Sequence, residues 1–72
     1  MITEKSLSLE EMVYTNREEE ILSGKLTRGT SLGEIPISLR LGVSRTPVRG
    51  ALHRLSEDGL VEILPNRGAV VL

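Results

Sequence analysis

Hydrophobic positions in the first third of the chain recur with the period of an α-helix. They are Leu9, Met12, Val13 and Ile21. Ser8 and Glu11 have the spacing of a capping box, in which each side chain satisfies a free backbone N–H at the start of a helix. Gly24 can end the helix in a left-handed turn. The pattern therefore predicts a helix over about 8–23, held by few contacts because polar residues at 16, 17 and 20 interrupt its apolar face.

A second helical pattern lies in the last third of the chain. Its apolar positions, spaced i, i+3, i+4 and i+7, are Val48, Ala51, Leu52 and Leu55. Ser44 is suited to cap the start of this helix and Gly59 to close it. Two apolar runs follow, at 61–64 and 69–72, and the residues between them, 65–68, have the composition of a tight turn. The pattern predicts a helix followed by a β-hairpin.

The segment between these two patterns allows two interpretations. Residues 24–33 contain three glycines and are expected to form a connector, in which Leu32 could enter a short strand. From Ile35 to Val43 apolar residues alternate with other residues, which slightly favours a strand. However, Glu34 and Pro36 are well suited to the first turn of a helix, where a proline loses no hydrogen bond and a carboxylate meets the positive end of the helix dipole.

Length and composition restrict the class of protein. Seventy-two residues make one small domain, expected as a flexible tail over 1–7 and a folded unit over 8–72. There is no cysteine, and the single histidine, His53, has no ligand-spaced acidic residues around it, so we expect no metal, no cofactor and no enzyme. No apolar run could cross a membrane, and the first residues lack the pattern of a signal peptide, which indicates a cytoplasmic protein.

The charge is unevenly distributed, although the net charge is only −1. Residues 1–34 carry four basic and seven acidic side chains, whereas residues 35–72 carry five arginines against three acidic side chains. Binding to phosphates depends on the surface that faces the duplex rather than on the total charge. The second half is therefore a candidate for nucleic-acid binding, and its net charge of +2 predicts weak binding by a single copy.

The polar face of the second predicted helix carries the candidate chemistry. Arg45 and Arg49 lie one turn apart and project the same way, with Thr46 between them. At the start of a helix that follows a glycine-centred turn, such arginines can bind guanine through two hydrogen bonds. The Ser44 hydroxyl and the free N–H groups beside it could hold a phosphate, and His53 is expected at another phosphate. Two arginines at this spacing are, however, ordinary surface charge on most exposed helices.

Two runs of the sequence resemble the N-terminal domain of GntR-family repressors. They are GVSRTPVRGALHRLSEDGLVE from Gly42 to Glu62 and PNRGAVV from Pro65 to Val71. The resemblance extends over residues 8–72, and the run VSRTPVR is typical of the FadR-like (FCD) subgroup, whose members carry an all-helical C-terminal effector-binding domain. Arg28, Gly33 and Gly50 depart from the family pattern, which normally has proline, serine and glutamate there. A glycine inside a helix costs about 1 kcal/mol relative to alanine.

The resemblance implies a mainly α-helical fold with a small β-hairpin, a winged helix-turn-helix of three helices and a two-stranded wing. It makes residues 34–41 the second helix, in place of the strand that the local pattern favours. The expected major-groove residues are Arg45, Thr46 and Arg49. The expected wing residues at the minor groove are Asn66, Arg67 and Gly68, because a narrow groove attracts arginine and glycine lets the backbone approach.

The resemblance further implies the sequence-specific DNA-binding domain of a bacterial, metabolite-responsive transcriptional regulator, a repressor. The implied partners are double-stranded DNA with a palindromic operator, a second copy in a full-length homodimer, and a small-molecule effector bound by a C-terminal domain that this chain lacks. The alternative is a winged helix that binds proteins rather than specific DNA. That alternative requires an exposed apolar face, for which Ile35 and Leu39 are the only candidates.

Overall fold

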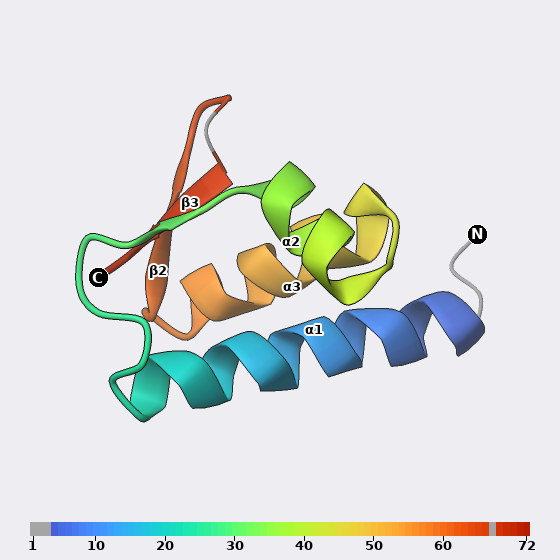
Figure 1. Cartoon of the computed structure of the whole chain (residues 1–72), viewed down its shortest axis with the longest axis horizontal. Coiled ribbons are helices and arrows are strands. Elements are labelled where there is room, and N and C mark those ends of the chain that lie inside the picture. The colour runs from blue at the N-terminus through green and yellow to red at the C-terminus, as the bar shows by residue number, and fades with distance from the viewer. Residues whose placement is uncertain (1–3, 67) are drawn as a thin grey trace.

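The computed structural model describes residues 4–66 and 68–72, with side chains from Ser8 onward. The elements in chain order are α1 (Glu4–Leu22), β1 (Ser31–Leu32), α2 (Glu34–Leu41), α3 (Arg45–Glu57), β2 (Val61–Leu64) and β3 (Gly68–Val71). Figure 1 shows α1 along one side of α3, with α2 and the sheet on the other side. None of the helices in the described ranges is long and apolar enough to cross a membrane.

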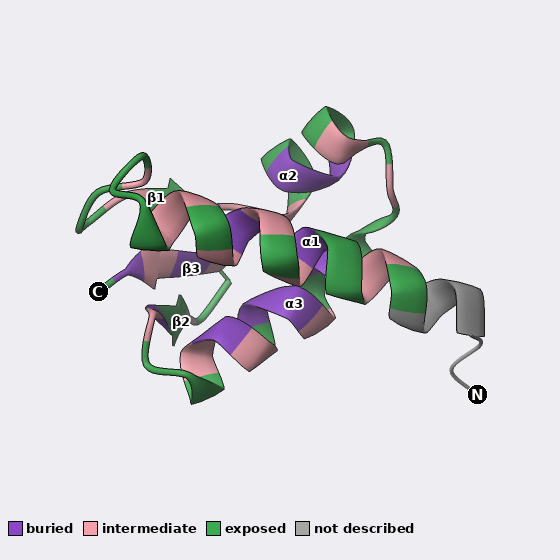
Figure 2. Ribbon diagram, turned by 90° about the horizontal axis from the view of Figure 1, so that it is seen from below, coloured by how far each residue is buried: buried purple, intermediate pink, exposed green. Residues whose placement is uncertain are grey.

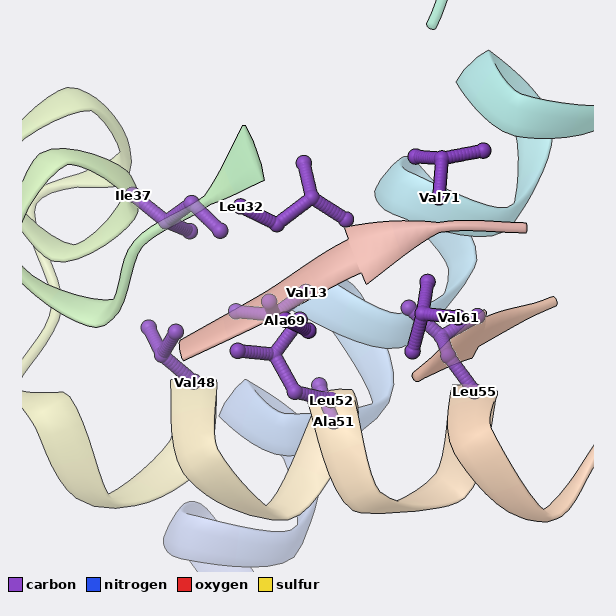
Figure 3. Close-up of a cluster of buried hydrophobic side chains, with 10 residues drawn as sticks. All are labelled: Val13, Leu32, Ile37, Val48, Ala51, Leu52, Leu55, Val61, Ala69 and Val71. Atoms are coloured by element: carbon purple, nitrogen blue, oxygen red, sulfur yellow. The ribbon is translucent and has the colours of Figure 1, made fainter. Parts of the chain in front are cut away.

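The apolar face of α3 forms the centre of the core, as the sequence predicted. Its four predicted positions, Val48, Ala51, Leu52 and Leu55, are all buried. Figure 3 shows these side chains directed toward Val13 of α1 and toward the strands. The helix begins at Arg45 as expected, and Gly59, with φ +77°, closes it. There the Leu60 N–H donates to the Leu55 carbonyl across the left-handed turn.

Residues 34–41 form the helix α2, which confirms the helix that the family resemblance implied, and the strand favoured by the local alternation is wrong. The alternation had suggested two faces, but Ile37 is the only buried apolar residue of α2. A short helix satisfies its own backbone groups while it places Ile37 against α3 and leaves Leu39 in solvent. Gly42, with φ +69°, then ends the helix, and the Val43 N–H donates to the Ser38 carbonyl.

The first helix starts earlier than predicted. It begins at Glu4, so Ser8 lies within the helix and the predicted capping box is wrong. The predicted tail 1–7 overlaps α1 at residues 4–7, and residues 1–3 lie outside the described part. A capping box marks a start only where the preceding residues leave the helix, and the Glu-Lys-Ser-Leu run before Ser8 contains good helix formers.

Arg17 completes the inner face of α1, where the sequence suggested an interruption. Arg17 is only 4% exposed and lies between Val13 and Ile21 on the same face of the helix. The guanidinium donates to the Asn16 side chain and lies 2.9 Å from the Glu20 carboxylate. The polar residues of α1 therefore satisfy the buried charge from within the helix, and the methylene stem of Arg17 can pack as an apolar side chain. Figure 2 shows the buried positions of α1 interspersed with exposed ones.

The sheet has three antiparallel strands in the order β1-β3-β2. The predicted hairpin is confirmed, with Leu64 opposite Gly68 and Val61 opposite Val71. The strand at Leu32, which the sequence left open, forms as β1 and pairs Leu32 with Ala69. The predicted two-stranded wing therefore gains a third strand. This strand, β1, follows the loop after α1 and places Leu32 in the core.

Gly68 lies where the hairpin passes close to the start of α2. Its φ is +75°, and a Cβ there would collide with the Leu32 carbonyl oxygen and lie 3.1 Å from the Gly33 Cα. These neighbours are backbone atoms, at the end of β1 and at the residue before α2, and they cannot rotate away as a side chain can. Gly24 has a similar φ of +84°, but a Cβ there would meet no described atom within 4 Å.

We predict that Gly68→Ala lowers the free energy of unfolding by about 3 kcal/mol, because it adds a backbone collision to the cost of the left-handed conformation. Gly24→Ala is the matched control and should cost only about 1 kcal/mol, the conformational cost alone. Urea unfolding followed by circular dichroism measures both values. Equal losses for the two variants would show that the contact between β3 and β1 does not constrain the wing.

Candidate nucleic-acid interface

An open cleft of about 680 Å³ lies between the start of α2, the outer face of α3 and the hairpin. It is lined by residues 33–36 of the α2 start, by residues 63–66 and 68 of the hairpin, and by Arg45, Arg49, Leu52 and His53 of α3. The two arginines and the histidine are exposed, whereas Leu52 forms the floor as part of the core. The cleft thus brings together segments that are up to 35 positions apart in the sequence, from Gly33 to Gly68.

The start of α3 has polar groups that the helix itself does not satisfy. Ser44 occupies the N-cap position of α3 and has an extended backbone, with φ −73° and ψ 170°, but its hydroxyl makes no capping hydrogen bond. The Ser44 hydroxyl is therefore not used by the helix itself. The start of α3 holds no acidic residue in its first turn, so its positive dipole end is not neutralised from within the helix.

A single carboxylate holds both arginines of the cleft. Glu34 accepts the Nε–H and an Nη2–H of Arg49, with both donor–acceptor distances 3.1 Å. It also accepts from Arg45, at 3.1 Å from Nη2 and 3.4 Å from Nε. Arg45 and Arg49 stay 55% and 57% exposed, while the Glu34 side chain behind them is 19% exposed. The arginines therefore form the outer surface of this cluster and Glu34 its inner side.

The electrostatics of this cluster favour the charged states of Glu34 and Arg49. The hydrogen bonds from Arg49 and Arg45 hold the pKa of Glu34 below its ordinary value of 4.5, against a smaller opposing effect of burial. The same contacts with Glu34 raise the pKa of Arg49. Two guanidinium groups and one carboxylate leave one net positive charge on this part of the surface. A surface of that sign suits a phosphate-rich partner.

The structure brings most of the predicted site residues together. Arg45, Arg49, His53, Asn66 and Gly68 line the one cleft. Thr46 and Ser44 are exposed at the start of α3, next to the cleft rather than in its lining. Arg67 lies outside the described residues. The paired arginines thus face the same open space as the hairpin turn, as a groove-reading role would require.

Sequence reasoning missed the role of Glu34. It treated this residue only as a partner of the helix dipole, because nothing in the local sequence connects it to arginines 11 and 15 positions later. The position of Glu34 among basic residues is the signal that could have indicated this role. Glu34 is the only acidic residue between Lys25 and Arg54, a stretch with four other arginines.

Arg54, the third arginine of α3, lies against α1. Its guanidinium lies over the Tyr14 ring, 4.0 Å from the centroid, and donates to the Glu11 carboxylate at 2.5 Å. The Tyr14 hydroxyl in turn lies within hydrogen-bonding reach of the Glu18 and Asp58 carboxylates, which raise the pKa of the phenol. Arg54 therefore joins α3 to α1 on the side away from the cleft.

The comparisons with known proteins agree with this geometry. The family model described as "Bacterial regulatory proteins, gntR family" matches residues 9–71. The chain belongs to the GntR family. It is 39% identical over 61 residues to the HTH-type transcriptional repressor RspR of Escherichia coli, an alignment that covers 85% of this chain and 27% of RspR. Proteins matched in this way are transcriptional regulators.

Solved structures share the fold of this chain. A GntR-family transcriptional regulator from Pseudomonas syringae pv. tomato matches with a TM-score of 0.80 at 33% identity, over 88% of this chain and 27% of that one. Lar of Listeria monocytogenes, described as controlling the expression of the agr system, matches with a TM-score of 0.74 at 37% identity, over 86% and 29%. The chain spans about a quarter of the length of these relatives.

The carboxylate of Glu34 should make the stability of this GntR-type domain depend on pH. Because its pKa in the folded state lies below 4.5, its ion pairs stabilise the fold above about that pH and are lost as the pH falls through the lower value. We predict that Glu34→Gln lowers the free energy of unfolding near neutral pH by at most about 1 kcal/mol, since the arginines are more than half exposed.

The difference between wild type and Glu34→Gln should shrink toward zero in acid, which urea titrations at neutral and acid pH would measure. Glu57→Gln, at the exposed C-terminal end of α3, is the matched control and should change little at either pH. A deficit of Glu34→Gln that stays constant down to acid pH would mean that the charge of Glu34 does not stabilise the fold.

Proposed function

We propose that this chain is the sequence-specific DNA-binding domain of a bacterial transcriptional repressor, and that α3 enters the major groove. The observation that carries the proposal is the pair of exposed arginines in the first turns of α3, in the cleft shared with the hairpin. The N-terminal residues of a recognition helix are those that reach base edges. Membership of a family of regulatory proteins supports the same function.

Each candidate residue has a distinct part in this proposal. Arg45 and Arg49 bind guanine edges, and Thr46 offers a hydroxyl to a base or phosphate and a methyl group to thymine. The Ser44 hydroxyl, which the helix leaves unused, and the N–H groups at the start of α3 bind one backbone phosphate. His53, farther along the cleft, contacts another phosphate.

The hairpin supplies the second contact with DNA. Asn66, which adopts a left-handed φ of +59°, and Gly68 lie at the turn that borders the cleft. In our proposal this turn follows the duplex from the major groove into the adjacent minor groove, where Arg67 is inserted. A narrow minor groove carries an enhanced negative potential, which attracts arginine.

The proposal extends beyond this domain. The similarity to the repressor RspR supports a role in repression. The run VSRTPVR supports a protein of the FadR-like subgroup, in which we expect a C-terminal domain to bind a small-molecule effector and to hold a homodimer on a palindromic operator. We place this regulator in the cytoplasm, where the chromosome of a bacterium lies.

Alanine substitution should separate base reading from general electrostatics. A duplex selected from a random pool with the wild-type chain serves as the cognate site, and a scrambled version of it as the control duplex. Arg45→Ala and Arg49→Ala should each lose about 1–3 kcal/mol on the selected duplex and much less on the scrambled one. Fluorescence anisotropy titrations at fixed salt measure both.

The matched control is Arg28→Ala, which removes an exposed arginine from the loop after α1, outside the cleft. It should change both affinities slightly and equally. Arg54 is unsuitable as this control because it joins α3 to α1. If Arg45→Ala and Arg49→Ala weaken the selected and scrambled duplexes in the same proportion, the arginines position the domain without reading bases.

Dimeric binding can be tested on this chain without the rest of the protein. Two copies joined by a flexible linker should bind a palindrome of the selected half-site about 100-fold or more tighter than one copy, because the second contact becomes intramolecular. The same tandem protein on a duplex with one half-site should gain only about twofold. Equal affinities of the tandem protein for the two duplexes would argue against a palindromic operator.

A further inference from the structure

We propose that Glu34 is a positioning residue for DNA reading, which fixes Arg45 and Arg49 together so that both present their end-on edges to the bases. This inference rests on the proposed DNA-binding function and adds a residue of α2 to the reading site. Glu34 lies on α2, whereas both arginines lie on α3. The helix α2 would therefore contribute to specificity indirectly, because its Glu34 orients the two arginines that contact the bases.

The hydrogen-bond geometry shows which donors Glu34 uses. Each arginine turns its Nε–H and an Nη2–H toward the carboxylate. A guanidinium has five N–H donors in a planar fork. Three hydrogens therefore remain for another partner, and one hydrogen of Nη1 and one of Nη2 lie side by side on the edge away from Glu34. This is the end-on edge, and two parallel donors are what the O6 and N7 atoms of guanine require.

The shared carboxylate also sets the spacing of the two guanidinium groups. The Nη2 atoms of Arg45 and Arg49 both lie 3.1 Å from the same Glu34 oxygen, so they cannot be farther apart than twice that distance. Base pairs in a duplex are stacked at about 3.4 Å. Two guanidinium groups held this close can reach the same or adjacent base pairs, and Glu34 thereby determines the register between them.

The exposure of the three side chains favours positioning over obstruction. Glu34 is 19% exposed and lies behind arginines that are more than half exposed, so the carboxylate does not cover the reading edges. Arginine side chains lose much rotamer freedom when they are immobilised at an interface. Because Glu34 already orders both arginines in the free domain, part of their rotamer entropy is lost during folding rather than on binding to DNA.

The test compares two variants of Glu34 on the selected and scrambled duplexes. Glu34→Gln removes the charge and keeps the length, and Glu34→Asp keeps the charge but is one methylene shorter, so it cannot hold both arginines. We expect the ratio of selected to scrambled affinity to fall about tenfold in Glu34→Gln and severalfold in Glu34→Asp. Affinity for the scrambled duplex should stay the same or rise in Glu34→Gln, because a negative charge near DNA is removed.

The matched control is Glu57→Gln, which removes one carboxylate from the other end of α3. It should raise both affinities equally and leave the ratio unchanged. A ratio that stays at the wild-type value in Glu34→Gln and Glu34→Asp would overturn the proposal, and a ratio that rises in Glu34→Gln would show that Glu34 holds the arginines away from the bases. Urea unfolding of each variant confirms that the folded domain is compared.

A measurement without DNA separates this inference from the proposed function. In nuclear magnetic resonance spectra of the free chain, the Nε–H signals of Arg45 and Arg49 should be distinct and slow to exchange with water. They should move to the averaged position of free arginines in Glu34→Gln, while Glu57→Gln leaves them in place. Averaged signals in the wild-type chain would overturn the positioning role. If the wild-type chain selects no sequence from the random pool, the DNA-binding proposal fails, whatever these signals show.

Discussion

The burial of one face of α3 is the constraint on which the rest of the structure depends. Val48, Leu52 and Leu55 are each at most 1% exposed, and they pack against α1, α2 and the sheet at once. A helix that commits one side to a core must present its other side to solvent. The direction of Arg45 and Arg49 is therefore a consequence of core packing, and any change that rotates α3 would also move the arginines.

Three arginines on α3 have different environments because of this packing. Arg45 and Arg49 point into the cleft and share Glu34, whereas Arg54 lies against the Tyr14 ring on the α1 side. Helical position alone separates these roles, since residues four apart share a face and residue 54 is rotated away from it. The same residue type thus lines the open cleft at one end of the helix and packs against α1 at the other.

The wing is held to the helical core by close backbone contact. Gly68 passes so near to the Leu32 carbonyl that no side chain fits, and β1 pairs with β3 on the edge that the hairpin alone would leave open. Gly50 differs from Gly68, because the atoms nearest to a Cβ there belong to the Glu10 side chain of α1, which can rotate away.

The sequence by itself determined the elements whose signals are local: the apolar face and boundaries of α3, the hairpin, and the exposed positions of Arg45, Arg49 and His53. Periodicity, glycine and turn residues fix these features because they act within a few positions. The family resemblance, rather than the local pattern, indicated that residues 34–41 are a helix. Only the tertiary structure decided that α1 starts at Glu4 and that Leu32 adds a third strand. The contact of Glu34 with two arginines belongs to the same group, since packing of α2 against α3 brings together charges that are 11 and 15 positions apart.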